Sequence, residues 1–194
     1  MTTATRVTAT ALHFSALADT LRGVTVEITD DGAALGCGVL WPRGCIVTNA
    51  HVVRRTRVAV WRHGGGRLEA RLVARDRALD LAVLALDRDD LPTATLAESG
   101  AARVGALVVA VGHPLGLRGA LTTGIIHAIA PIARGGAPWI HADLRLAPGN
   151  SGGPLADVSG AIIGINAMVV GGLALAVPVA RVREFVRDAG LTPT

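Results

Sequence analysis

The chain has 194 residues, of which 51% are hydrophobic and 18% charged, so it can bury one large core or two small ones and is not intrinsically disordered. All 19 basic residues are arginine, and the lack of lysine excludes Walker-type phosphate loops and Schiff-base catalysis, which both need an amine. The formal net charge of +4 does not indicate a nucleic-acid partner.

Two features of the chain bear on its cellular compartment. Residues 1–23 lack a basic start followed by an uninterrupted apolar run, so the sequence predicts no signal peptide. The two cysteines, Cys37 and Cys45, are too few for a disulfide-built scaffold and are compatible with a reducing compartment. They are either two small buried thiols or a bridge formed on oxidation. We therefore expect a cytoplasmic protein.

A short amphipathic helix is the first predicted element. Phe14, Leu17 and Leu21 recur at helical spacing. Gly23 follows as a stop, so the pattern predicts a helix over residues 13–22.

Short β-branched runs follow this helix at intervals of about ten residues, separated by turn residues, and this spacing is typical of all-β folds. The first set of runs consists of VTVEI, GVLW, CIVT, VAVW, LEARLVA and DLAVLAL. A stretch of weaker pattern, residues 87–103, separates it from a second set. The second set consists of ALVVAV, ALTTGIIHAI, WIHAD, GPLAD, AIIGI and LALAV. Each set therefore predicts about six strands.

Residues 161–177 carry no charge and have the length of a very short membrane span. They contain Asn166 and a turn signal at Gly171 and Gly172, so two buried strands joined by a turn are the better interpretation. The last element is a helix over residues 178–190, with Pro178 at its start and Gly190 at its end.

Two successive six-strand sets without helical crossovers cannot form a parallel sheet, which needs a long connection between strands. We therefore predict an all-β fold of two packed antiparallel six-stranded β-barrels, with short N-terminal and C-terminal helices. The barrels are expected over residues 24–90 and 104–177, within a single domain spanning residues 1–194.

The stretch APGNSGGPL, residues 147–155, interrupts the strand pattern and contains Ser151. It satisfies G-x-S-x-G, the nucleophile elbow of α/β-hydrolases, but in those enzymes the catalytic histidine follows the serine. No histidine follows His141, so this interpretation fails on chain order. The subtilisin order would require Asp30 or Asp31 as the acid, and both stand in an expected turn.

The remaining order, His then Asp then Ser, fits His51, Asp80 and Ser151, and it is the order of chymotrypsin. A serine hydroxyl is a weak nucleophile near neutral pH unless a base removes its proton, and an acid must fix the tautomer of that base. Asp76 is the rival for Asp80, but it stands between arginines and is better explained by a surface ion pair.

Glycine at position 149 permits a backbone conformation in which neighbouring amides face one small concavity. The amides of Gly149, Asn150 and Ser151 are therefore the predicted oxyanion hole, where negative charge develops on the substrate carbonyl.

The blocks TNAHVV, DLAVL and APGNSGGPL resemble the three catalytic blocks of the trypsin-like serine proteases, specifically the HtrA group. Further matches to that group are GCGVLW, VGHPLG, LTTGIIHAI, IIGINA and GGLALAVPV. The resemblance covers about residues 12–190 and implies a chymotrypsin-like fold. It also implies a serine endopeptidase acting on unfolded or misfolded polypeptides, with His51, Asp80 and Ser151 as its triad.

The same resemblance implies a primary substrate pocket lined by Leu146, Ala167, Met168 and Val169, with Leu175 near its far wall. Such an apolar pocket would accept small or medium aliphatic side chains.

Arg145 complicates this expectation, because trypsin-type enzymes place their specificity-setting residue six positions before the serine. A guanidinium turned inward would favour acidic substrate side chains or block the pocket, whereas a guanidinium facing solvent would leave the aliphatic preference unchanged.

HtrA proteases usually continue into PDZ domains, and none is expected within these 194 residues. By analogy with that group, residues 12–22 could support a homotrimer. The expected partners are polypeptide substrates, without nucleic acid or a membrane span, and no cofactor is expected. His141 and Asp143 lack a third ligand at metal spacing, so no metal site is predicted.

Two other functions stay open. The same fold could be a peptide-binding or chaperone-like module whose site is closed at rest, or a structural protein that only inherited the fold. Separately, eight arginines lie between residues 54 and 77. They form either a solvated sheet edge or a basic surface that attracts acidic partners.

Overall fold

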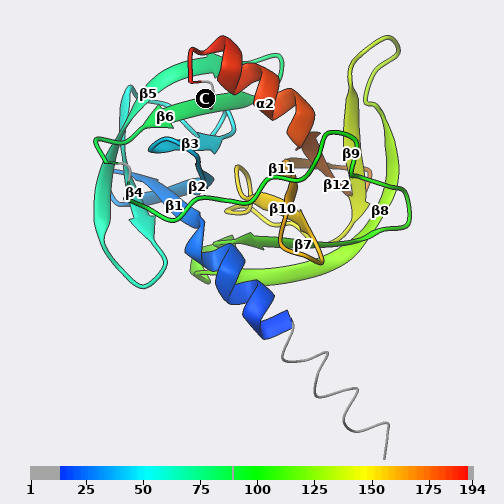
Figure 1. Ribbon diagram of the computed structural model, residues 1–194, viewed down its shortest axis with the longest axis horizontal. Helices are drawn as coiled ribbons and strands as arrows, with labels where there is room; N and C mark the ends of the chain where they lie inside the picture. Colours follow the sequence, from blue (N-terminus) through cyan, green and yellow to red (C-terminus); the bar gives the residue numbers. More distant parts are fainter. Residues whose placement is uncertain (1–13, 89, 192–194) are drawn as a thin grey trace, which may run out of the picture.

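Two six-stranded barrels lie side by side in the molecule (Figure 1). The structure is a computed structural model that describes residues 14–88 and 90–191. The strands of the first barrel are β1 (Thr25–Asp30), β2 (Ala33–Trp41), β3 (Cys45–Thr48), β4 (Arg57–Arg62), β5 (Arg67–Asp76) and β6 (Leu81–Ala85). Those of the second barrel are β7 (Leu107–Gly112), β8 (Ala120–Pro131), β9 (Pro138–Asp143), β10 (Pro154–Asp157), β11 (Ile162–Val170) and β12 (Leu173–Pro178).

Both barrels close with the same strand order. The first runs β1-β2-β3-β6-β5-β4 and the second β7-β8-β9-β12-β11-β10, and every pairing between these strands is antiparallel. Closure leaves no long sheet edge to be protected. The predicted fold of two packed antiparallel barrels is confirmed.

The cores of the two barrels differ in extent. One apolar cluster fills the first barrel and continues across the interface, since Val60 and Leu84 belong to the same cluster as Val111 and Ile165 of the second barrel. A smaller cluster fills the second barrel and is rich in alanine. Close packing of this kind resists deformation, so the surface cleft between the barrels has firm walls.

Two helices flank the barrels. The N-terminal helix is helical over residues 14–23, and His13 of the predicted span lies outside the described residues. Its apolar face packs on the larger cluster through Phe14, Leu17 and Leu21. The signal-peptide and trimer expectations also fall partly on residues 1–13, which the structure does not describe.

The C-terminal helix, α2 (Val179–Asp188), crosses the top of the molecule in Figure 1 and contacts β6, β11 and β12. It buries Val179, Val182 and Val186, which recur at helical spacing. Since β6 and β11 belong to different barrels, this helix braces one barrel against the other.

The uncharged stretch that could have been a membrane span forms β11 and β12, joined by a turn at Gly171 and Gly172, as predicted. Within residues 14–88 and 90–191, no helix is long and apolar enough to cross a bilayer.

Candidate active site

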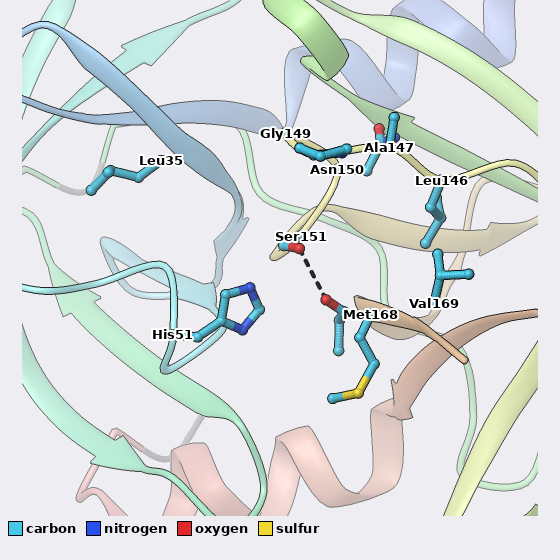
Figure 2. Close-up of a pocket in the computed structure, with 11 residues that line it drawn as sticks. Leu35, His51, Leu146, Ala147, Gly149, Asn150, Ser151, Met168 and Val169 are labelled. Atoms are coloured by element: carbon cyan, nitrogen blue, oxygen red, sulfur yellow. Dashed lines mark hydrogen bonds between the residues drawn. The ribbon is translucent and has the colours of Figure 1, made fainter. Parts of the chain in front are cut away.

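The predicted site residues meet at a cleft of about 700 Å³ on the surface between the barrels (Figure 2). The first barrel contributes His51 and Leu35, and the second contributes the segment 146–151 with Ala167, Met168 and Val169. His51 lies in the turn after β3, while Ser151 lies in the loop before β10. The two parts of the cleft are therefore brought together by the packing of the barrels.

His51 and Asp80 form a close pair. The imidazole Nδ1 lies 2.8 Å from Asp80 Oδ2 and 3.0 Å from Oδ1, and the His51 backbone N–H donates to Oδ1 at 3.1 Å. The Asp80 side chain is only 13% exposed, whereas that of His51 is 49% exposed. A carboxylate held in this way makes Nδ1 the protonated nitrogen and leaves Nε2 able to accept a proton.

The backbone at Asp80 takes an unusual conformation, with a φ of +53°. It is held by Asn49, whose side-chain NH2 donates to the Asp80 carbonyl at 2.9 Å. Left-handed backbone at a non-glycine residue costs about 1–2 kcal/mol. Its presence at Asp80 indicates that the site requires this carboxylate at this position. The rival carboxylate, Asp76, accepts the backbone N–H groups of Ala78 and Leu79, at 2.8 and 2.9 Å. It makes no ion pair with any residue that the structure describes, so the pair expected with its arginine neighbours is not found there.

The shape of the loop that carries Ser151 depends on the glycine at position 149. Gly149 has a φ of +103°, and a Cβ atom there would lie 2.4 Å from the His113 carbonyl oxygen. The His113 backbone N–H donates to the Gly149 carbonyl at 3.1 Å, and the Leu115 N–H donates to the Pro148 carbonyl at 3.3 Å. Both carbonyls are thus bound by the turn 113–117, which contains the one-turn 3-10 helix η1 (Pro114–Gly116). In a trans peptide the C=O and the N–H point in opposite directions. The peptide bond between Pro148 and Gly149 directs its C=O toward this turn, so its N–H, which belongs to Gly149, points away from the turn.

The three predicted oxyanion amides are not equivalent. The Asn150 N–H donates to the Ala147 carbonyl at 3.0 Å, closing a turn. No acceptor within the described part of the chain takes the N–H of Gly149 or Ser151. The donors left for a ligand are therefore those of Gly149 and Ser151, on either side of the Asn150 amide.

The Ser151 hydroxyl is not bonded to His51. It donates to the Ala167 carbonyl at 2.9 Å, shown as the dashed line in Figure 2, where the His51 imidazole lies to the left of this bond. Catalytic hydrogen bonds are often long or misaligned without substrate, so this geometry does not oppose a nucleophilic role.

Cys37 is a contact that the sequence did not reveal. Its thiol donates to the Gly149 carbonyl at 2.9 Å, and its backbone N–H donates to the Ser151 carbonyl at 2.7 Å. Burial raises the pKa of the Cys37 thiol to about 12, so it stays protonated and able to donate. Strand β2 of the first barrel therefore supports the serine loop of the second.

A disulfide between the cysteines is incompatible with the strand register. Both cysteines are free and buried, and Cys45 is paired with Trp41, four residues from Cys37 along β2. Four residues of strand span about 13 Å, well beyond the ~7 Å limit for the Cα atoms of a disulfide.

His113 is a second contact that the sequence did not reveal. It is buried, its Nδ1 accepts the Gly119 N–H at 2.9 Å, and its Nε2 has no partner among the described residues. Burial lowers the pKa of His113, against the opposing charge of Glu27, so the ring is held neutral beneath the serine loop.

The predicted substrate-pocket residues divide into two groups. Leu146, Ala167, Met168 and Val169 line the cleft, whereas Leu175 does not. Leu175 is completely buried, and Ala174, Ala176 and Val177 are buried as well, so both faces of β12 are covered.

The Arg145 side chain is exposed and lines an adjoining groove with residues of the turn 113–117; this groove shares Leu146 and Val169 with the cleft but does not include Ser151. Within residues 14–88 and 90–191, no three His, Cys, Asp or Glu side chains lie close enough to hold a metal ion.

Known proteins resemble this chain over most of its length. The family described as trypsin-like peptidase domain matches residues 36–165. "Probable periplasmic serine endoprotease DegP-like" of Halomonas elongata is 40% identical over 161 residues, covering 78% of this chain and 34% of that protein. "Serine protease HTRA2, mitochondrial" of Bos taurus is 41% identical over 151 residues, covering 73% of this chain and 33% of that protein. The chain thus spans about a third of the length of these relatives.

The expected cytoplasmic location is wrong. Two of the similar proteins, from Halomonas elongata and Pseudomonas savastanoi, carry the word periplasmic in their names. The expectation rested on what residues 1–23 lack and on the small number of cysteines, and the absence of such features is weak ground for a location.

Solved structures agree with the sequence relatives. "HtrA-type protease AlgW with decapeptide" superposes with a TM-score of 0.83 at 26% identity, covering 91% of this chain and 67% of that one. "HtrA-type protease AlgW with tripeptide" superposes with a TM-score of 0.82 at 30% identity, covering 92% and 63%. The chain therefore belongs to the trypsin-like peptidase family, and its domain is of the HtrA type.

Proposed function

We propose that the protein is a serine endopeptidase that cleaves polypeptides through an acyl-enzyme. The observation that carries this proposal is the meeting of His51, already paired with Asp80, and Ser151 in one cleft. Two unpartnered amides lie in the same loop as the serine. A nucleophile, a base with its orienting acid, and oxyanion donors are the complete set that acyl transfer requires.

In the proposed reaction, Ser151 Oγ leaves the Ala167 carbonyl and attacks the scissile carbonyl carbon while His51 Nε2 takes its proton. The substrate oxygen becomes an oxyanion that accepts hydrogen bonds from the Gly149 and Ser151 amides. Collapse of this intermediate breaks the C–N bond, and His51 protonates the departing amine. Water then repeats the sequence on the ester and releases the acid. Asp80 stabilises the imidazolium in both halves.

Strand β11 supports the proposal that the substrate is an extended polypeptide. Its partner β10 pairs with it only as far as Ile165, so the segment from Met168 to Val170 pairs with β12 alone. An extended peptide can add to such an edge through main-chain hydrogen bonds. Apolar side chains of Leu146, Met168 and Val169 next to this edge favour an aliphatic residue before the scissile bond.

Unfolded or misfolded proteins are the proposed substrates, because only an extended segment reaches this edge. An exported location, such as the periplasm, is proposed from the names of the two bacterial relatives. The triad assignment, the oxyanion donors and the aliphatic preference belong to the same proposal.

Ser151→Ala tests the activity. The variant should keep its melting temperature and lose turnover of an unfolded casein by roughly 10⁶-fold, the loss seen when a catalytic serine is removed. Undiminished cleavage by Ser151→Ala would contradict the proposal.

A fluorophosphonate probe tests the state of the site independently. Labelling at Ser151 in the wild type, but not in His51→Ala, would identify an activated serine. A folded wild type that binds unfolded casein without reacting with the probe would support the peptide-binding alternative, which the hydroxyl bond to Ala167 would then explain.

A further inference from the structure

A groove of about 440 Å³ lies against the His51–Asp80 pair and is lined by three arginines, Arg54, Arg75 and Arg77. His51 lines both this groove and the cleft that contains Ser151. An occupant of the groove would therefore contact the imidazole. The three arginines themselves take no part in the proposed chemistry.

The arginine-rich segment from residue 54 to residue 77 is divided by how its charges are satisfied. On one side, Arg55 makes ion pairs of 3.0 Å with both Asp30 and Asp31, and Arg67 lies 3.7 Å from Glu69. By contrast, none of the three groove arginines has a carboxylate at ion-pair distance within the described residues. The carboxylates of the first barrel therefore neutralise Arg55 and Arg67 but not the three groove arginines.

Arg75 is held in place although its charge is unpaired. Its Nη2 donates to the Val53 carbonyl, which ties strand β5 to the segment after His51. Its Nε is buried without a partner in the described structure. A guanidinium fixed by one hydrogen bond loses little freedom when a ligand arrives, so it is pre-organised for an anion.

Arg54 and Arg77 supply two further charges, and both side chains are exposed. The acid in the groove is Asp80, whose two oxygens are already bonded to His51. Three guanidinium groups therefore face a single committed carboxylate, and the groove keeps a net positive charge.

We propose that this groove is a substrate subsite that binds the carboxylate of an Asp or Glu side chain close to the scissile bond. Guanidinium groups match carboxylates in shape and can bind them through two parallel hydrogen bonds. The inference rests on the proposed function, since it assigns a preference to the same active site.

The test compares matched peptides that share an aliphatic residue before the scissile bond. Asp or Glu replaces Asn or Gln at each of three positions on both sides, and kcat/KM is measured at low and high salt. At one or more positions the wild type should prefer the acidic peptide by roughly two- to fivefold for each exposed guanidinium engaged, an advantage that shrinks in high salt.

The variant for this test is Arg54→Gln with Arg77→Gln, which spares Arg75 because that residue ties two segments together. The matched control is Arg71→Gln, an exposed arginine of β5 outside the groove. The double variant should lose the acidic preference while its kcat/KM on the neutral peptide stays within twofold of wild type. The control should keep the preference.

The outcomes separate the two proposals. No cleavage of any peptide by folded wild type would overturn the proposed function. Cleavage with equal kcat/KM for acidic and neutral peptides, or a preference that survives in the double variant, would overturn the subsite alone. A preference lost equally in Arg71→Gln would show that general surface charge, and not the groove, attracts the acid.

Discussion

The two barrels hold their parts of the candidate site in different ways. In the first barrel, His51 and Asp80 stand directly beside strand ends, and they are joined to each other and to Asn49 by short hydrogen bonds. In the second barrel, Ser151 stands in an irregular loop whose shape depends on Gly149 and on contacts with the turn 113–117. The base and acid are thus positioned locally, whereas the nucleophile is positioned by distant segments.

This difference predicts which half of the site is easier to disturb. An irregular loop with few buried apolar contacts can lose its shape without global unfolding, because such regions open at low free energy. Substitutions at the site residues of the first barrel should therefore change mainly the catalytic chemistry. Substitutions in the second barrel should change mainly the geometry of the loop that carries Ser151.

The largest effect is expected from Asp80→Asn in the first barrel. The amide keeps the shape of the carboxylate but favours the wrong imidazole tautomer, so kcat should fall by about 10⁴-fold. Melting temperature should change little by comparison. Steady-state kinetics on a chromogenic peptide with thermal unfolding in parallel would check this. A loss of activity matched by a collapse of stability would instead make Asp80 a folding residue.

Gly149→Ala should have the next largest effect, through the second barrel. The added Cβ would meet the His113 carbonyl at 2.4 Å, so the loop must move and its amides with it. Loss of one oxyanion donor lowers kcat by about 10²–10³-fold.

The matched control for this substitution is Gly171→Ala, since Gly171 also has a positive φ, +59°, but has open space around its Cα. Kinetics that fall equally in both variants would attribute the effect to backbone strain in general and contradict the specific role of the loop.

Cys37 tests how the first barrel supports the loop of the second. Cys37→Ala removes the donor to the Gly149 carbonyl, and a net hydrogen bond of about 1 kcal/mol corresponds to a roughly fivefold fall in kcat. Cys37→Ser keeps a donor and should restore kcat, with KM similar in all three proteins. If serine and alanine at this position behave alike, the thiol contributes packing only.

His113 should produce the smallest effect, visible as a pH dependence of stability. Burial lowers its pKa in the folded state, so at pH values just below the ordinary histidine pKa the unfolded chain binds the extra proton. The contribution of the neutral His113 ring to the free energy of unfolding is fully present above about pH 6.5 and decreases as the pH falls below that value. Thermal unfolding between pH 5 and 8 should show a shallower decline in His113→Asn. An unchanged slope would exclude His113 as its source.

Much of the fold could be predicted because local sequence patterns specify it. Period-two runs and turn residues predicted the twelve strands, and Pro178 and Gly190 predicted the ends of α2 to within two residues. The order of His51, Asp80 and Ser151 restricted the candidate chemistry before any coordinate was known.

Two of the misses involve partners far apart in the chain. The thiol of Cys37 reaches a carbonyl 112 residues away, and the Ser151 hydroxyl reaches one 16 residues away. Leu175 is buried because both faces of β12 are covered in the folded protein, which no local pattern reveals. The compartment was mistaken for another reason, since it was judged from the absence of a signal.

The sequence by itself determined the all-β class, the two sets of six strands and the residue types available for acyl transfer, because hydrophobic period and chain order are properties of the chain alone. Only the tertiary structure decided which amides of the loop at Gly149 stay unbonded, where the Ser151 hydroxyl points, and which arginines remain unpaired beside His51. Hydrogen bonds and ion pairs act over a few ångströms, so they depend on which segments the closed barrels bring together and not on the distance between residues along the chain.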